Sequence, residues 1–251
     1  MYIENINPII FELGPLAVRW YGVMFAVSVL IGFYYMRKNG AERGLDEDFI
    51  FSFFIFLLLA IIIGARAVYV AANWAYFVER PELIIRIDRG GLAFHGGLIG
   101  GILVSWLYCR FKNKNWSILA DLAVPGVAVG IMLVRIANIF NQEILGREAT
   151  LFAFDRHPAQ VYGSLIGLLL VLLHNYLARR KELKPGFLFW SFVLGYTLLR
   201  GFFEETFRDN PLAVWGYINE AWGAGFFTTV QIFTPLIIIL SLYMLWKIRK
   251  S

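Results

Sequence analysis

Long apolar stretches separated by short polar segments dominate the chain. Seven of them approach the roughly 20 residues that a helix needs to cross a bilayer, and charged residues, proline or glycine flank each one. They cover residues 17–36, 49–71, 91–110, 118–140, 159–178, 186–206 and 226–246. The pattern predicts an all-α integral membrane protein with about seven transmembrane helices, short outer connecting segments and one membrane domain over residues 1–251.

Lysine and arginine are distributed unevenly over the polar segments. They concentrate in alternate segments, at residues 37–43, 110–114, 179–184 and 247–250. Because basic residues near span ends favour the cytoplasmic side, this bias predicts an outside N-terminus and a cytoplasmic C-terminus. The N-terminal segment has no basic residue and no small-residue cleavage site after a short apolar core, so we expect no cleaved signal peptide.

The composition narrows the function classes. Charged residues make up 16% of the chain, against roughly 25% in an ordinary soluble domain. The net charge is +5. The basic residues lie in the segments that set membrane orientation and near the ends of spans, so nucleic acid is not expected as a partner. A single cysteine, Cys109, excludes an intramolecular disulfide framework and paired-cysteine zinc patterns. We expect neither a metal nor another cofactor.

Polar residues inside the predicted spans collect toward the outer leaflet. Ionisable groups are costly at membrane depth and by default mark function. Those near the outer ends of spans, or just beyond them, include Arg19, Tyr21, Arg66, His95, Arg135, Asn138, Asn141, Glu143, His157, Arg200 and Glu204. The sequence therefore predicts a polar pocket that opens toward the outer side of the membrane.

Two pairs in this set differ from isolated arginines. A lone arginine near a span end, such as Arg19, can simply lift its charge into the interface. Arg135 and Asn138 are three residues apart, and Arg200 and Glu204 are four apart, so each pair would share a helix face. We therefore expect these two pairs to face a functional pocket.

The residue types favour chemistry at a phosphate group. Guanidinium groups bind phosphate through two hydrogen bonds and stay charged. His95 is the strongest candidate for a general base, and the glycines that follow it, Gly96, Gly97, Gly100 and Gly101, would let another helix approach closely. The sequence has no HExxH pattern and no serine with matching histidine and aspartate partners. Departure of phosphate from a phospholipid fits better than hydrolysis by a metal or a serine nucleophile.

Several motifs, in their order, resemble the prolipoprotein diacylglyceryl transferase family. They are Arg19–Gly22 (RWYG), Arg89–Gly100 (RGGLAFHGGLIG), Arg135–Glu143 (RIANIFNQE) and Arg156–Tyr162 (RHPAQVY). The resemblance implies a multi-pass enzyme of the bacterial inner membrane with its active site toward the outer leaflet. It also implies transfer of the diacylglyceryl group of phosphatidylglycerol to the lipobox cysteine of a prolipoprotein, with formation of a thioether and release of glycerol phosphate. We expect a monomer.

The resemblance also suggests residue roles. It implies catalytic roles for His95, Arg135 and Arg200, and substrate binding by Tyr21, Arg66, Asn138, Asn141, Glu143, Glu204 and His157. The family spaces an arginine, a glutamate and a second arginine at 0, +4 and +7. Here Arg200 and Glu204 keep the first interval, whereas Glu205 and Arg208 keep the second, as if one residue were inserted. We assign the family's glutamate to Glu204 because it shares a face with Arg200, and Glu205 is the alternative.

Two further departures concern small residues. Ala137 stands where the family usually has glycine, and Gly163 stands where it has an acidic or larger residue. These departures leave open a related transferase with a different acceptor. Two other functions also remain in view: a phospholipid-binding or translocating protein, and an acyltransferase that moves one fatty chain. A transferase should consume phosphatidylglycerol only when a thiol acceptor is present, whereas a translocator would move intact lipid without one.

Overall fold

The computed structural model describes residues 7–14, 16–87, 90–150, 155–180, 183–213, 217–219 and 221–250. Helices account for most of these residues. The chain divides into two compact units, one formed by Met1–Tyr35 and Ala120–Ser251 and the other by Met36–Leu119. The prediction that residues 1–251 form one membrane domain concerns both units together and stays a prediction.

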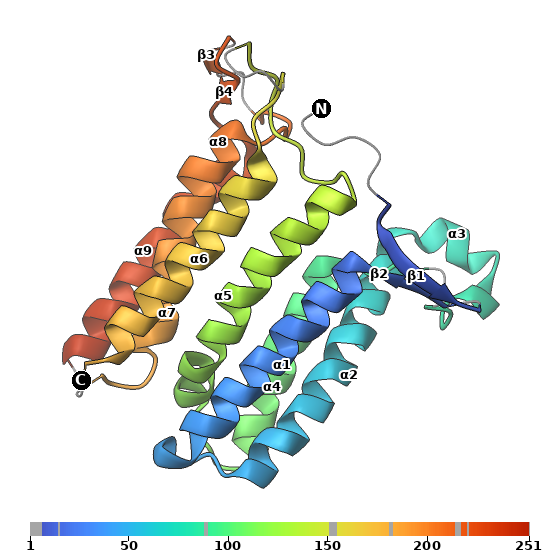
Figure 1. Cartoon of the computed structure of the whole chain (residues 1–251). Helices are drawn as coiled ribbons and strands as arrows, with labels where there is room; N and C mark the ends of the chain where they lie inside the picture. The colour runs from blue at the N-terminus through green and yellow to red at the C-terminus, as the bar shows by residue number, and fades with distance from the viewer. Residues whose placement is uncertain are drawn as a thin grey trace. The chain divides into compact units, whose positions relative to one another are not determined.

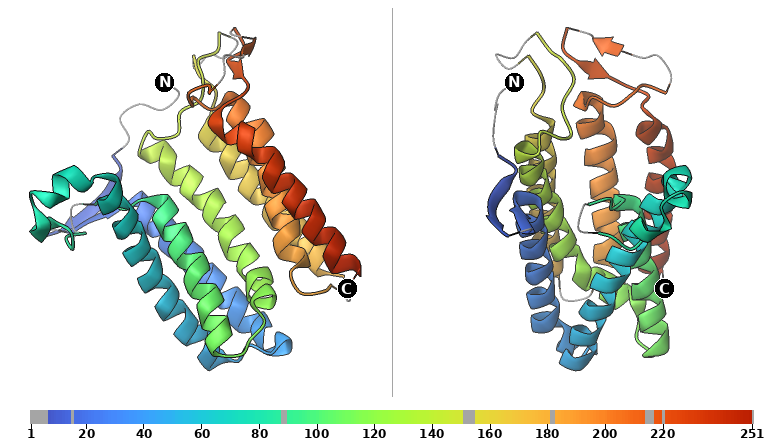
Figure 2. Two further views of the ribbon diagram at one scale, coloured as in Figure 1. Left: turned by 180° about the vertical axis from the view of Figure 1, so that it is seen from behind. Right: turned by 90° about the vertical axis from the view of Figure 1, so that its right-hand side faces the viewer.

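The first unit contains most of the helices (Figure 1). Its elements are β1 (Ile9–Leu13), β2 (Leu16–Arg19), α1 (Trp20–Gly40) up to Tyr35, α5 (Trp116–Phe140) from Ala120, α6 (Ala159–Ala178), α7 (Phe187–Leu198), the π-helical turn η3 (Leu199–Glu204), α8 (Glu205–Phe207), β3 (Tyr217–Asn219), β4 (Ala224–Gly225) and α9 (Thr229–Lys250). Helix α7 packs against α9 and α6, and Figure 2 shows α9 beside α7.

The second unit is built around one helix pair. Its elements are the end of α1, η1 (Ala41–Arg43), α2 (Glu47–Ala72), α3 (Trp74–Val78), η2 (Pro81–Leu83), α4 (Phe94–Phe111) and the start of α5. Helices α2 and α4 lie against each other because glycines meet at their contact: a Cβ built on Gly96 would lie 2.1 Å from the carbonyl oxygen of Gly64. The sequence predicted this close approach from the small residues after His95, without naming the neighbouring helix.

Four helices in the described part of the chain are long and apolar enough to cross a membrane: α2, α5, α6 and α9. They match the predicted spans 49–71, 118–140, 159–178 and 226–246. Helices α1, α4 and α7 fall in the other three predicted ranges, and their passage through the membrane stays a prediction. The chain is thus a mostly helical, multi-pass membrane protein.

Two helix starts have identifiable caps. The Asp46 carboxylate accepts a hydrogen bond of 2.8 Å from the backbone N–H of Phe49 and begins α2. Before α7, Gly186 adopts a left-handed conformation with φ of 92°, which favours glycine. The buried carboxylate of Asp121 on α5 accepts hydrogen bonds of 2.8 Å from the backbone N–H groups of Gly186 and Phe189. Asp121 therefore joins α7 to α5.

Two small antiparallel sheets were not predicted. Strand β1 pairs with β2 just before α1, and β3 pairs with β4 before α9. Both are short, so neither carries an apolar alternation long enough to stand out beside the membrane spans. The chain is accordingly not entirely α-helical.

Candidate active site

A buried ion pair joins α5 to the end of α7 in the first unit. Nη2 of Arg135 lies 2.7 Å from Oε1 of Glu204. Arg135 is 9% exposed and Glu204 is 0% exposed. Nε of Arg200 lies 3.8 Å from the same carboxylate oxygen, so Glu204 faces two guanidinium groups. The i,i+4 relation between Arg200 and Glu204 was predicted from sequence, whereas the pairing of Glu204 with Arg135 was not.

The adjacent glutamate pairs with Arg200 as well. Nη1 of Arg200 donates a hydrogen bond to Oε2 of Glu205, and Nδ2 of Asn210 donates to Oε1 of Glu205 at 2.5 Å. Both glutamates are fully buried. Neighbouring residues of an α-helix point about 100° apart, so one helix face would not normally present both side chains to the same arginine.

The π-helical turn η3 explains how both glutamates reach Arg200. It spans Leu199–Glu204, and a π turn accommodates one extra residue within a helix. The irregular spacing from Arg200 to Arg208 indicated such an insertion in the sequence. Glu205, which α-helical periodicity would place on another face, is thereby brought to Arg200.

Arg208 adds a third positive charge beside this cluster. Burial is the main cause that lowers the pKa of the Arg208 guanidinium, and the positive charges of Arg200 and Arg135 lower it further. Within the part of the chain that the structure describes, no carboxylate forms an ion pair with Arg208. Three arginines and two glutamates therefore make an arginine–glutamate cluster with an excess of positive charge, which favours an anionic ligand.

Gly163 on α6 makes room for Arg135. A Cβ built at this position would lie 2.4 Å from Nε and 2.7 Å from Cδ of Arg135. The sequence marked Gly163 only as a departure from the family pattern. The structure gives a physical reason for a small residue here, because any larger side chain would displace the Arg135 guanidinium from Glu204.

The segment that follows α5 brings further predicted residues near Arg135. Asn138 is buried, and its carbonyl oxygen accepts a 3.0 Å hydrogen bond from the backbone N–H of Glu143. The Gln160 side chain on α6 donates at 2.7 Å to the Glu143 carbonyl. Tyr21, at the start of α1, interacts electrostatically with Glu143 and Arg135. Four of the predicted residues thus lie in one region.

This segment contains a strained turn and an unpartnered polar atom. Gln142 and Ile144, on either side of Glu143, have φ values of 56° and 59°. A positive φ is unusual for a β-branched residue such as Ile144, and strain of this kind collects at functional sites. Oδ1 of Asn141 is buried and accepts no hydrogen bond from the described residues. Asn141 therefore has an acceptor available for a ligand.

His157 lies in the same unit but is held by its neighbours. Its Nδ1 lies 3.1 Å from the hydroxyl of Tyr162, and its Nε2 lies 2.6 Å from the carbonyl oxygen of Trp222. The ring is buried and lies against Phe207. With both ring nitrogens engaged, His157 is better placed to hold the segment around Trp222 against α6 than to contact substrate. Its predicted part in substrate binding stays a prediction.

Arg147 and Arg156 brace the segment between α5 and α6. Buried Arg147 donates to the carbonyl oxygen of Asn210 at 2.7 Å. Arg156 lies 2.9 Å from Oδ2 of Asp209 and 2.8 Å from Oε1 of Glu148. The hydrogen bond to Asp209, together with the charges of Asp209 and Glu148, raises the pKa of the Arg156 guanidinium. These contacts flank Arg208 and Asn210 and hold the chain beside the cluster.

Two predicted residues, His95 and Arg66, belong to the second unit. His95 is exposed in the first turn of α4 and is followed by the buried Gly96 and Gly97. The guanidinium of Arg66 on α2 donates to four backbone carbonyls, those of Leu83, Ile84, Gly90 and Gly91. Arg66 therefore holds the connection that leads to His95. Arg89, the first residue of that motif, lies outside the described residues.

The structure thus brings together six predicted residues in the first unit. They are Tyr21, Arg135, Asn138, Glu143, Arg200 and Glu204. Sequence reasoning missed the contributions of Gly163 and Asn210. Only the unexpected glycine gave a signal for the first, and nothing in the sequence singled out the second.

These features define a class: a helical, multi-pass membrane protein with a buried arginine–glutamate cluster suited to an anionic group. The sequence model of the family described as Prolipoprotein diacylglyceryl transferase matches residues 8–247. The chain belongs to this family.

Similar proteins extend over almost the whole chain. A phosphatidylglycerol--prolipoprotein diacylglyceryl transferase of Thermoanaerobacter sp. (strain X514) is 43% identical over 252 residues, which cover 100% of this chain and 97% of the relative. A protein of the same name from Thermus thermophilus is 34% identical over 273 residues, with 96% of this chain and 98% of the relative covered. Because coverage is nearly complete on both sides, the family relationship extends to the entire membrane region.

Proposed function

We propose that this chain transfers the diacylglyceryl group of phosphatidylglycerol to the lipobox cysteine of a prolipoprotein. The observation that carries the proposal is the buried cluster of Arg135, Arg200 and Arg208 with Glu204 and Glu205, in a chain of this family. The names of its relatives state the same two substrates. The product is a prolipoprotein that carries the diacylglyceryl group on its cysteine through a thioether. This transfer is the first step of lipoprotein maturation.

The arginines bind the phosphate of the lipid headgroup. Guanidinium groups suit phosphate oxygens because their paired N–H groups match two oxygens at once. Arg135 and Arg200 stabilise the negative charge that grows on the leaving phosphate, since fixed charges in a site shielded from water are effective there. Arg208, whose guanidinium forms no ion pair with a described residue, supplies further positive potential.

The carboxylates act as positioning residues. Glu204 holds Arg135 and Arg200, and Glu205 with Asn210 holds Arg200 from a second direction. A guanidinium fixed in this way has few alternative rotamers, so it is already oriented when the substrate arrives. We assign substrate contacts to Tyr21, which interacts electrostatically with Arg135 and Glu143. We assign them also to Asn138, Asn141 and Glu143, which lie on the Arg135 helix or in the segment directly after it. Arg66 and His157 serve the reaction by holding backbone segments.

The thiol substrate needs a group that orients it and accepts its proton. We assign this role to His95, whose exposed imidazole is of the type that transfers protons near neutral pH. The sulfur attacks the glycerol carbon that carries the phosphate ester. A carbon–sulfur bond forms, the carbon–oxygen bond breaks, and its electron pair leaves with glycerol phosphate while the thiol proton passes to His95. Cys109 is buried in α4, so the acceptor thiol belongs to the substrate.

We propose seven spans with an outside N-terminus, in the inner membrane of a bacterium. The four apolar helices and the unequal distribution of lysine and arginine support this arrangement. Single cysteines introduced into a Cys109→Ser background test it with a membrane-impermeant maleimide on intact spheroplasts. Glu82→Cys and Glu148→Cys should react, whereas Lys38→Cys and Lys112→Cys should react only after lysis.

The transferase activity is tested with purified protein, phosphatidylglycerol and a lipobox peptide. The peptide should gain the mass of one diacylglyceryl group, and glycerol phosphate should appear in equal amount. Release should cease when serine replaces the peptide cysteine. Lipid movement between leaflets without peptide would instead support a translocator, and gain of a single acyl chain would support an acyltransferase.

His95→Gln and Arg135→Ala separate the two halves of the proposed mechanism. Both should abolish glycerol phosphate release, but Arg135→Ala should also weaken lipid binding, whereas His95→Gln should leave it intact. Full release by both variants would overturn the proposed roles.

A further inference from the structure

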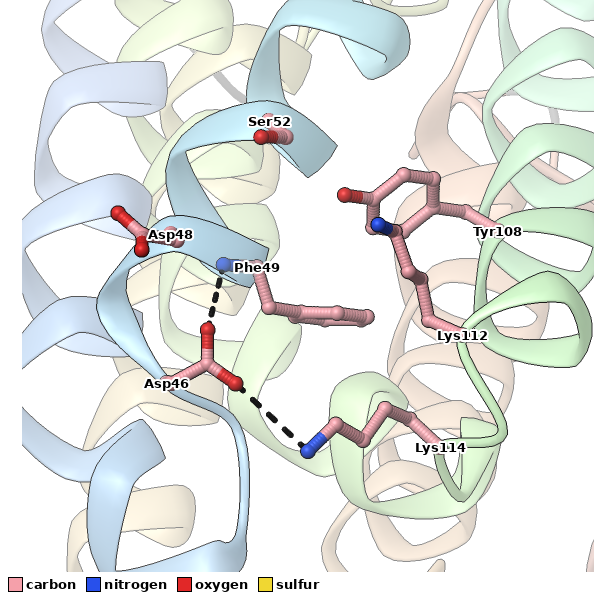
Figure 3. Close-up of a pocket in the computed structure, with 7 residues that line it drawn as sticks. All are labelled: Asp46, Asp48, Phe49, Ser52, Tyr108, Lys112 and Lys114. Atoms are coloured by element: carbon pink, nitrogen blue, oxygen red, sulfur yellow. Dashed lines mark hydrogen bonds and ion pairs between the residues drawn. The ribbon is translucent and has the colours of Figure 1, made fainter.

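A small pocket lies in the second unit, and none of its lining residues is among those assigned to the transfer reaction. It is formed where α2 begins and α4 ends (Figure 3). Its volume is about 170 Å³, and it is lined by Asp46, Asp48, Phe49, Ser52, Tyr108, Lys112 and Lys114. The lining combines two ammonium groups, two carboxylates and two hydroxyl groups with two aromatic rings, which is unusual on a chain as apolar as this one.

Tyr108 presents an unpartnered hydroxyl to this pocket. The side chain is only 8% exposed, and its buried hydroxyl has no hydrogen-bond partner among the described residues. Its ring packs against Phe49 and Phe53, with centroids 4.9 Å and 5.9 Å away. Figure 3 shows the hydroxyl directed from α4 toward α2, across the pocket. Buried polar groups are nearly always hydrogen-bonded, so the fixed orientation of this hydroxyl points to a ligand.

The charges at the base of the pocket neutralise each other. The two oxygens of Asp46 face the backbone N–H of Phe49 at 2.8 Å and Nζ of Lys114 at 3.7 Å. Lys114 also donates to the carbonyl oxygen of Gly44 at 2.6 Å. Asp46 is therefore occupied in capping α2 and pairing with Lys114, and it does not present a free negative charge to the pocket.

The remaining polar groups are mostly hydrogen-bond donors. Within the described part of the chain, Lys112 forms no ion pair. Figure 3 shows the Asp48 carboxylate on the side of α2 that faces away from Tyr108. Asp48 lines the pocket, but with its carboxylate turned from Tyr108, the groups gathered on the Tyr108 side are the Lys112 ammonium and the hydroxyls of Ser52 and Tyr108. An ammonium and two hydroxyls in a small space match the oxygens of a phosphate group.

We propose that this pocket binds a phosphate oxyanion, carried by a phospholipid headgroup or present as free phosphate. Lys112 supplies the charge, Tyr108 and Ser52 donate hydrogen bonds, and the Asp46–Lys114 pair closes the base. In the orientation proposed above, this end of α2 and α4 faces the cytoplasm, so the lipid would come from the inner leaflet. The site does not depend on the transfer reaction.

The experiment measures binding in an Arg135→Ala background, which removes the proposed headgroup site in the other unit. The probes are dioctanoyl phosphatidic acid, inorganic phosphate, and dioctanoylglycerol as a phosphate-free lipid. Native mass spectrometry of the detergent-solubilised protein gives stoichiometry and apparent affinity for each. We expect one bound phosphate-bearing probe per chain and weaker binding of dioctanoylglycerol.

Two pocket variants and two matched controls assign the bound probe to this pocket. Lys112→Gln should weaken binding about tenfold and Tyr108→Phe about threefold, because each removes one donor. Lys38→Gln and Tyr34→Phe change the same residue types at exposed positions outside the pocket, and they should bind as the parent does.

The three probes distinguish the sources of the phosphate. Binding of phosphatidic acid alone identifies a lipid site, and equal binding of inorganic phosphate identifies a site for free phosphate. Lack of phosphate-dependent binding, or equal affinities in the pocket variants and the controls, would overturn the proposal. With Arg135 intact, Lys112→Gln and Tyr108→Phe should retain transfer activity, which shows that both variants fold. A failure of the phosphate-binding proposal is thereby distinguished from a failure of the proposed transferase function.

Discussion

The guanidinium of Arg135 and the carboxylate of Glu204 form a buried ion pair between α5 and the π-helical turn after α7, with 2.7 Å between Nη2 and Oε1. Removing one member of a buried pair costs about 3–5 kcal/mol because it leaves an uncompensated charge. The pair therefore fixes both the position of Arg135 and the association of these two elements.

Glu204 and Glu205 should differ in their importance for transfer. Glu204→Gln removes the carboxylate that faces both Arg135 and Arg200, so we expect kcat to fall about 100-fold. Glu205→Gln removes one hydrogen-bonded partner of Arg200 but leaves Glu204 facing it, so a loss of about tenfold is expected. Steady-state transfer kinetics with a lipobox peptide measure both. A larger loss in Glu205→Gln than in Glu204→Gln would assign the family's glutamate to Glu205.

Gly163→Ala should impair catalysis by moving Arg135. The added methyl group would lie 2.4 Å from Nε of Arg135, so the guanidinium must shift, and a displacement of about 1 Å can cost up to 100-fold in rate. We expect kcat to fall about 10- to 100-fold. Gly130→Ala is the control on the Arg135 helix, because its Cβ would make an ordinary 3.6 Å contact with Ser28. Similar rates in the two variants would show that Arg135 tolerates the shift.

Gly96→Ala should destabilise the α2–α4 pair. Its Cβ would lie 2.1 Å from the Gly64 carbonyl oxygen, and overpacking of this kind costs about 1–3 kcal/mol. The thermal midpoint of the purified protein should fall by several degrees. Gly101→Ala, in the same helix, would meet its nearest neighbour at 3.5 Å and should melt close to the parent. Equal thermal midpoints for Gly96→Ala and the parent would mean that α2 and α4 accommodate the added methyl group without loss of stability.

Asp46→Ala should lower the thermal midpoint in a pH-dependent manner. The hydrogen bond from Phe49, and secondarily Lys114, lower the pKa of Asp46 below its ordinary value of 3.8. A lowered carboxyl pKa contributes stability that is complete above the unfolded-state value and is lost as pH falls through the folded-state value. The gap between the parent and Asp46→Ala should stay constant from pH 7 to about 5 and close below about 4. A gap that widens in acid would contradict this sign.

The sequence was most informative where apolar length alone determines structure. The predicted spans 49–71 and 159–178 correspond to α2 (Glu47–Ala72) and α6 (Ala159–Ala178). The predicted span 186–206 covers α7, but periodicity could not show that its end becomes a π-helical turn, because that geometry depends on packing against other elements. The two-stranded sheets were also missed, since their pairing is local and short.

The candidate site divides in the same way. Arg135, Asn138, Arg200 and Glu204 were predicted because polar and charged groups inside an apolar span are conspicuous. The pairing of Arg135 with Glu204 was not predicted, because this contact joins helices distant in sequence. Arg66 was predicted as a substrate contact, yet its guanidinium donates to four backbone carbonyls. A sequence shows that an arginine inside an apolar span needs hydrogen-bond acceptors, but it does not tell whether the chain or a ligand supplies them.

An incoming phosphate must compete with the carboxylates of Glu204 and Glu205, which already pair with the arginines of the cluster. A phosphodiester carries a single negative charge, whereas the departing phosphate monoester approaches a charge of about −2. The more charged species is better able to draw Arg135 and Arg200 away from Glu204 and Glu205. Intact lipid would therefore be held loosely, and the arginines would engage most strongly as the ester bond breaks, which favours the transition state over the bound substrate.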